Sequence, residues 1–207
     1  MKLVSLKIVA RGAAGWESPD LIFGARTTSL FAPNGSGKTP LVPAIAYCLG
    51  FDSKFRDDIR DHCQAVVLTV VHDGKKIALR RDFGKEFHIT LSDGRIEREF
   101  FSEGEYSKAL FAEFGLRPPS LVGSNRQMTQ PYLSTVLPVF YVRQDGGYNE
   151  AYRAPATFIT DQFVEMVRFL FGLSPRRSYD VQRELLEARE QLEGIQRRLV
   201  FQEKVVS

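Results

Sequence analysis

The sequence predicts an α/β protein, and three observations lead to this fold class. Short runs rich in Val, Ile and Phe alternate with turn-forming Gly and Asp residues, as is typical of strands joined by tight turns. Two stretches, 103–114 and 154–172, carry apolar residues at helical spacing. A glycine-rich stretch, 32–39, lies between a β-branched run and a helical run. We expect these parts to form one domain over residues 1–176.

The stretch Ala32–Thr39, with the sequence APNGSGKT, approaches the phosphate-loop pattern G-x-x-x-x-G-K-[ST]. We expect a strand over Thr27–Phe31 before it and a helix over Leu41–Leu49 after it, which is the context that this motif requires. Lys38 would reach the β- and γ-phosphates of ATP, and the Thr39 hydroxyl would ligate Mg²⁺. The positive end of the helix would also face the phosphates. The sequence therefore predicts a P-loop NTPase, with a phosphate site at Asn34, Gly35, Ser36, Gly37, Lys38 and Thr39.

Three residues depart from the usual form of this motif. Ala32 replaces the first glycine, and its methyl group restricts the backbone at that position. Pro40 should fall in the first helical turn, where a missing N–H group costs little. Pro43 lies deeper in the predicted helix. We therefore expect Pro43 to remove one backbone hydrogen bond and to kink the helix.

The other expected strands follow one another along the chain. One is expected over Leu3–Ala10 and a short one over Leu21–Phe23. Asp-Gly pairs at 73–74 and 93–94 separate β-rich runs, which indicates hairpins and an antiparallel β meander. A short buried strand is expected over Leu137–Val142. Because a phosphate loop usually follows a central parallel strand, we expect Thr27–Phe31 to occupy that place.

The pattern changes near residue 177. Apolar residues then recur at alternating spacings of 3 and 4, with charged residues on the other faces, which is heptad spacing. The apolar positions are Leu185, Ala188, Leu192, Ile195 and Leu199. This pattern predicts that residues 177–207 begin a coiled-coil arm, and the alternative is an amphipathic surface helix.

The composition is ordinary for a globular protein, with 43% hydrophobic and 26% charged residues. The net charge of +3 is weak support for an anionic partner and fits simple solubility equally well. Cys48 and Cys63 lack metal-ligand spacing, so we expect buried, reduced thiols. No apolar run reaches the roughly 20 residues of a membrane span, and Lys7 interrupts the short apolar start of the chain. We therefore expect a cytoplasmic protein with no membrane partner.

Hydrolysis at such a site also requires a strand ending in an Asp that holds Mg²⁺, often beside a Glu that activates water. Two apolar runs, ending at Asp73 and near Asp145, each offer one acid without a second beside it. The segment Leu91–Gly94, LSDG, is faintly similar to the signature motif of transport-type ATPases, but a hairpin turn explains it better. We interpret the chain as the first half of a split site.

The order of these parts resembles the N-terminal half of an SMC-like ATPase head. In order, the chain contains a strand ending at Arg11, the phosphate loop, a β meander, the sequence Tyr141–Gln144, a helical lobe and the start of a coiled coil. Among such proteins it looks most like the ATPase subunit of the Mre/Rad double-strand-break repair complex. The resemblance covers nearly all of the chain and depends on two motifs and an arrangement rather than on close identity.

This resemblance implies an ABC-ATPase-like head lobe that binds ATP and Mg²⁺. Gln144 would contact the Mg²⁺ and the attacking water, and Arg11 would approach the nucleotide. The C-terminal half of the head, with its acidic pair, would follow an antiparallel coiled coil. Two heads would sandwich ATP, hydrolyse it on dimerisation and bind double-stranded DNA, with a nuclease or effector subunit as a further partner.

The departures at Ala32, Pro40 and Pro43 suggest a divergent bacterial member, such as those used in defence against phage or plasmids. Two alternatives stay open. One is a small P-loop kinase or GTPase, which would need its own Mg²⁺ acid. The other is a coiled-coil scaffold that binds a nucleotide without hydrolysing it.

Overall fold

The computed structural model describes residues 1–34, 36–84, 86–125, 127–142, 149, 152–176 and 179–206. The strands are β1 (Lys2–Ala10), β2 (Leu21–Ile22), β3 (Cys63–His72), β4 (Lys75–Asp82), β5 (Ile89–Ser92), β6 (Glu97–Phe100), β7 (Leu121–Val122) and β8 (Met128–Thr129). The helices are α1 (Leu41–Cys48), α2 (Asp57–His62), α3 (Glu103–Glu113), α4 (Leu133–Val136), α5 (Gln162–Leu170), α6 (Tyr179–Val206) and the 3₁₀ helix η1 (Leu137–Val139). Helices and strands are both present, so the mixed α and β content predicted by the sequence is confirmed.

The chain divides into two compact units. The first comprises residues 1–118 and 131–157, and the second comprises residues 119–130 and 158–207. The first unit holds the large sheet and α1 to α4, and the second holds β7, β8, α5 and α6. The sequence predicts a domain boundary between residues 176 and 177 for a different reason, namely that the heptad pattern begins there. That boundary stays a prediction.

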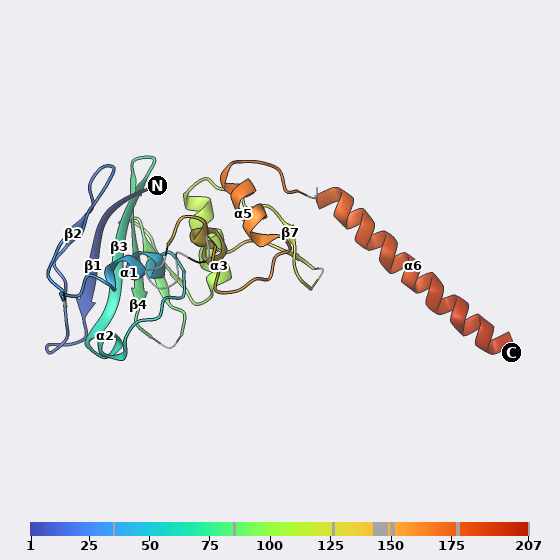
Figure 1. Cartoon of the computed structure of the whole chain (residues 1–207), viewed down its shortest axis with the longest axis horizontal. Helices are drawn as coiled ribbons and strands as arrows, with labels where there is room; N and C mark the ends of the chain where they lie inside the picture. The colour runs from blue at the N-terminus through green and yellow to red at the C-terminus, as the bar shows by residue number, and fades with distance from the viewer. Residues whose placement is uncertain are drawn as a thin grey trace. The chain divides into compact units, whose positions relative to one another are not determined.

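A six-stranded sheet in the order β2-β1-β3-β4-β5-β6 forms the first unit, and each neighbouring pair is antiparallel. Figure 1 shows β2, β1, β3 and β4 side by side, with α1 lying across them. The expected parallel strand over Thr27–Phe31 is wrong. This segment is irregular, and the Phe31 side chain is 91% exposed. A β-branched run forms a strand only where a neighbouring strand accepts its hydrogen bonds, and Thr28 instead accepts a hydrogen bond from the Gly24 amide.

The predicted hairpins are confirmed. Asp73 and Gly74 join β3 to β4 with φ values of 47° and 77°, as expected for a two-residue type I′ turn. Between β5 and β6, the Asp93 carboxylate accepts hydrogen bonds from the Arg95 and Ile96 amides at 3.0 and 2.9 Å. The LSDG segment is therefore part of a hairpin, as the sequence favours.

The core of the first unit lies between the sheet and its helices. Its fully buried side chains include Leu6, Ala44, Cys48, Val66, Leu68, Ile77, Leu79, Ile89, Tyr106 and Leu110. Cys48 and Cys63 are both buried free cysteines, as predicted. Burial raises the pKa of the Cys48 thiol to about 12, so this group is an unreactive core residue.

The predicted strand over Leu137–Val142 is wrong. Leu137–Val139 forms a 3₁₀ helix that continues directly from α4, and Val142 is 70% exposed. Pro138 explains the difference, because it has no N–H group for a strand ladder and its fixed φ suits the first turn of a helix.

The predicted helix over 154–172 begins later, at Gln162, and its buried face differs from the apolar stripe expected. Gln162, Glu165 and Met166 are buried, whereas Phe171 is 77% exposed. The buried polar groups have partners: the Gln162 side chain accepts a hydrogen bond from the Phe158 amide at 3.1 Å, and Glu165 accepts one from the Arg176 amide at 3.1 Å. Local hydrogen bonds therefore decide which side of α5 is covered.

The helix predicted at the end of the chain is α6, which has 28 residues and is about 42 Å long at 1.5 Å per residue. Leu185, Leu192, Ile195 and Leu199 are each more than half exposed. The helix is confirmed, and its pairing in a coiled coil stays a prediction. Within the described ranges, no helix is both long enough and apolar enough to cross a bilayer.

Candidate functional site: the phosphate loop and helix α1

The candidate phosphate loop leads directly into α1. Pro40 is the N-cap residue, with φ −75°, and its carbonyl accepts a hydrogen bond from the Ala44 amide at 3.0 Å. The Leu41 amide donates to the Lys38 carbonyl at 3.1 Å, so the loop and the helix are continuous. The arrangement of loop and helix predicted after Lys38 is therefore present.

The expected effect of Pro43 is wrong. Because α1 begins at Leu41, Pro43 is its third residue, and the first four N–H groups of a helix have no intrahelical partner. No helical bond is lost at Pro43, and the helix continues to Cys48. The Pro43 carbonyl also accepts a hydrogen bond from the Ser53 hydroxyl at 3.2 Å, which ties the start of α1 to the segment beyond its end.

The ammonium group of Lys38 lies inside its own loop. It donates to the Pro33 carbonyl at 2.5 Å and to the Ala32 carbonyl, and it lies 3.4 Å from the Ser36 hydroxyl. The Ser36 hydroxyl in turn donates to the Pro33 carbonyl at 2.8 Å. The loop therefore places one positive charge beside the amino end of α1, where an anion is favoured.

The backbone of the loop explains which glycines it requires. Gly37 has φ +79°, which a residue with a side chain adopts only under strain. Ala32, in contrast, is not among the described residues with positive φ, so a methyl group there does not strain the backbone. The limited backbone freedom that we expect at Ala32 is therefore compatible with the conformation of this loop. Gly35 lies outside the described residues.

The remaining predicted site residues are placed in different ways. Asn34 and Thr39 are exposed on the loop. The Arg11 guanidinium donates to the Phe83 carbonyl at 3.1 Å and to the Cys63 carbonyl at 3.4 Å, so it links the end of β1 to the start of β3 and to the residue that follows β4. Its approach to a nucleotide stays a prediction. Gln144 lies outside the described residues.

The residues of the loop fit phosphate better than they fit a metal ion alone. Over the described ranges, no group of three or more His, Cys, Asp or Glu side chains could hold a metal. Mg²⁺ in nucleotide sites is held largely by substrate phosphates and water, with few protein oxygens. The Thr39 hydroxyl is therefore a sufficient protein ligand only if ATP brings the metal.

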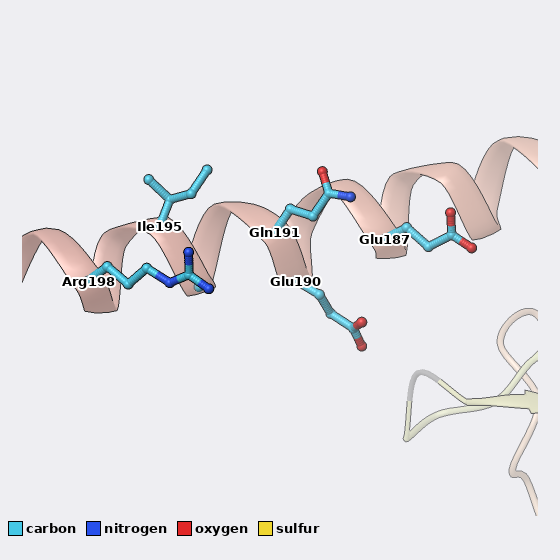
Figure 2. A pocket seen from close by; sticks show the side chains of 6 residues that line it. Glu187, Glu190, Gln191, Ile195 and Arg198 are labelled. Carbon is cyan, nitrogen blue, oxygen red and sulfur yellow. The ribbon is translucent and has the colours of Figure 1, made fainter.

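In the described part of the chain, one hollow borders α1 and the segment before the loop, and another lies on α6 in the second unit. The first encloses about 160 Å³ and is lined mainly by apolar residues of β1, β2, α1 and the segment before the loop. These apolar residues include Leu6, Leu21, Ile22, Leu30, Leu41 and Ile45. The second lies along α6 (Figure 2), and because all of its lining residues come from that one helix, it is an open groove.

The sequence reasoning missed the residues that hold the other end of α1. Arg81 on β4 donates to the Tyr47 and Phe51 carbonyls at 2.8 and 3.1 Å, and Tyr106 on α3 donates to the Cys48 carbonyl at 2.6 Å. A signal was present for Arg81. It shares the period-two face of β4 with Ile77 and Leu79, which are both buried, so alternation alone places it inside.

The chain matches no protein-family model, and no curated protein gives a significant match. Its functional assignment therefore depends on the local geometry of the phosphate loop and α1.

Proposed function

We propose that this chain binds ATP with Mg²⁺ through residues 34–39 and forms the N-terminal half of an SMC-like ATPase head of the ABC class. The observation that carries the proposal is the position of Lys38, whose ammonium lies in a glycine-containing loop at the amino end of α1. A lysine, a helix amino end and a Gly-dependent turn are three of the features with which phosphate loops bind phosphate; the segment before this loop is irregular, so the proposal depends on these three.

In this proposal, each part of the loop has a separate role. Lys38 transfers its hydrogen bonds from carbonyls to the β- and γ-phosphates, the amino end of α1 faces the same phosphates, and Thr39 ligates the Mg²⁺ that ATP brings. Gln144 would contact the metal and the attacking water, as the family resemblance implies. Mg²⁺ supplies charge neutralisation of the phosphates when it is bound.

Turnover in this proposal requires further surfaces. An acidic pair comes from the C-terminal half of the head, reached through an antiparallel coiled coil that α6 begins, and a second head completes the ATP sandwich. The assembled heads act on double-stranded DNA in repair, chromosome maintenance or defence, together with a nuclease or effector subunit, in the cytoplasm. The exposed apolar positions of α6 support the coiled coil.

The direct test replaces Lys38 by Ala and measures Mg·ATP binding by isothermal titration calorimetry. Charge-assisted hydrogen bonds contribute roughly 1.5–3 kcal/mol, so affinity should fall about ten- to a hundredfold. Lys54→Ala is the matched control, because Lys54 is an exposed lysine just beyond α1. Equal affinity in wild type and Lys38→Ala would refute the site.

A scaffold that binds nucleotide without hydrolysing it is the second candidate. The exposed apolar positions of α6 favour it as well, since they indicate association whether or not ATP is turned over. Light scattering on the full-length protein, with both halves of the proposed head, with and without Mg·ATP separates the two. A nucleotide-dependent increase in mass supports the ATPase head, and an identical mass supports the scaffold.

A further inference from the structure

Arg81 is a buried cation whose hydrogen-bond partners are neutral. Arg81 is 6% exposed. In the described part of the chain, its guanidinium donates hydrogen bonds to the Tyr47 and Phe51 carbonyls. The guanidinium also lies 3.8 Å from the Tyr47 ring and 4.7 Å from the Phe87 ring. The carboxylates of Asp52 and Glu103 lie close enough to interact with its charge, but the hydrogen bonds of the guanidinium go to carbonyls. Burial of a charge whose hydrogen-bond acceptors are neutral opposes folding. Such a residue therefore needs a reason other than stability.

The partners of Arg81 indicate that reason, because they belong to the carboxyl end of α1. Carbonyls at this end carry the negative end of the helix dipole, which a cation stabilises. Two further side chains hold the same end: Tyr106 donates to the Cys48 carbonyl, and the Tyr47 hydroxyl donates to the Asp82 carbonyl at 2.8 Å. β4 and α3 therefore fix α1 at the end away from the phosphate loop.

The length of α1 makes this anchor relevant to the loop. Eight residues span about 12 Å, so the Arg81 charge acts along a short, continuous helix. The Arg81 charge lies at one end of α1 and the loop at the other, so the two charges are at least about 12 Å apart, and at an effective dielectric constant of about 20 their interaction changes an affinity by at most about tenfold. Burial reduces screening at the Arg81 end of the helix, whereas the loop residues at the other end are exposed to water and salt.

We propose that Arg81 is a positioning residue of the phosphate loop, which holds α1 by its carboxyl end and adds a buried positive charge that favours an anion at the amino end. The proposal rests on the ATP site proposed above. It gives a residue of β4 a role in nucleotide binding, which the sequence of the loop motif alone does not predict. Arg81 acts through α1 and touches no phosphate itself.

The experiment compares Arg81→Gln, Arg81→Met and the control Arg80→Gln. Gln keeps an amide donor for the carbonyls and removes the charge, and Met removes both. Arg80 is the neighbouring residue of β4, is 35% exposed and pairs with Asp82, so its substitution removes a positive charge without touching α1. Inorganic triphosphate with Mg²⁺ and Mg·ATP are the probes, measured by calorimetry, and the thermal unfolding midpoint of each variant is recorded.

We expect Arg81→Gln to bind both probes more weakly than wild type, by up to about tenfold. Its unfolding midpoint should fall, because the shorter side chain leaves a buried carbonyl of Tyr47 or Phe51 without its donor. Arg81→Met should lose at least as much affinity, and Arg80→Gln should bind like wild type. Affinity within twofold of wild type in Arg81→Gln overturns the proposal, as does an equal loss in Arg80→Gln. If wild type binds neither probe, the ATP site itself is refuted, which is a different result.

Discussion

Replacing Tyr106 by Phe removes one buried hydrogen bond and no packing volume. The Tyr106 side chain is fully buried, and its hydroxyl donates to the Cys48 carbonyl at 2.6 Å, at the end of α1. Gly50, with φ +93°, packs closely against the same ring. A Cβ atom added at Gly50 would lie 3.4 Å from the ring carbons of Tyr106. Phe keeps this ring and its contact with Gly50. The perturbation is therefore limited to the hydroxyl group.

Loss of a buried hydrogen bond that leaves a carbonyl without its donor costs about 1–3 kcal/mol. Urea unfolding of Tyr106→Phe at pH 8 should show this loss as a lower midpoint with an unchanged slope. Tyr152→Phe is the matched control, because the Tyr152 hydroxyl also donates to a carbonyl, that of Thr135, at 2.7 Å, but is only partly buried. Its loss should be smaller, at most about 1 kcal/mol.

The pH dependence gives a second, independent measurement. Burial raises the pKa of Tyr106 well above its ordinary value. The unfolded chain loses the phenolic proton near pH 10 and the folded chain keeps it, so the stability that the phenol contributes is complete below pH 10 and is lost as pH rises toward the folded pKa. The slope is about 1.4 kcal/mol per pH unit for one group.

Tyr106→Phe has no such proton, so the gap between wild type and variant should narrow above pH 10. Burial also raises the pKa of Tyr47, but that effect is common to both proteins and cancels in the difference. A variant as stable as wild type at pH 8, or a gap that stays constant from pH 9 to pH 11, would refute the reasoning.

Two further predictions concern the loop and the meander. Ala32→Gly should leave the affinity for Mg·ATP within twofold of wild type, because Ala32 lies outside the positive-φ region and has no backbone strain that glycine could relieve. A fivefold gain in affinity, measured by calorimetry, would contradict this prediction. Asp93→Ala should lower the urea midpoint at pH 7, because the Ile96 and Arg95 amides and Lys75 hold the pKa of Asp93 well below its ordinary value. That stability is complete above about pH 5 and is lost as pH falls through the unfolded value near 4 toward the lower folded pKa, so the gap between the midpoints of wild type and variant should narrow progressively below about pH 4.

Features fixed by neighbouring residues were predictable from the sequence. The β3–β4 hairpin follows from Asp73-Gly74, whose positive φ values only a few residue types adopt without strain. The start of α3 follows from Ser102, whose hydroxyl accepts a hydrogen bond from the Glu105 amide. In both cases the whole cause lies within four residues, so the sequence contains it.

Features that need a distant partner were not predictable. Thr27–Phe31 and Leu137–Val142 have strand composition, yet propensity does not supply the neighbouring strand that would accept their hydrogen bonds. The same limit applies to part of α5, where buried Glu165 accepts a hydrogen bond from the amide of Arg176, beyond the end of the helix, which no periodicity indicates. Arg81 is intermediate, because alternation places it inside but only the fold shows that it reaches α1.

The geometry of Lys38 bears on how the loop binds an anion. Its ammonium is held by two neutral carbonyls, those of Ala32 and Pro33. A phosphate would add the attraction of an opposite charge, which the neutral carbonyls do not offer to the ammonium, so exchange of one set of acceptors for the other is favoured. The carboxyl end of α1 is fixed by buried groups and cannot follow this exchange. If the loop binds an anion as proposed, we therefore expect movement to be confined to the loop and the lysine side chain, while α1 keeps its direction.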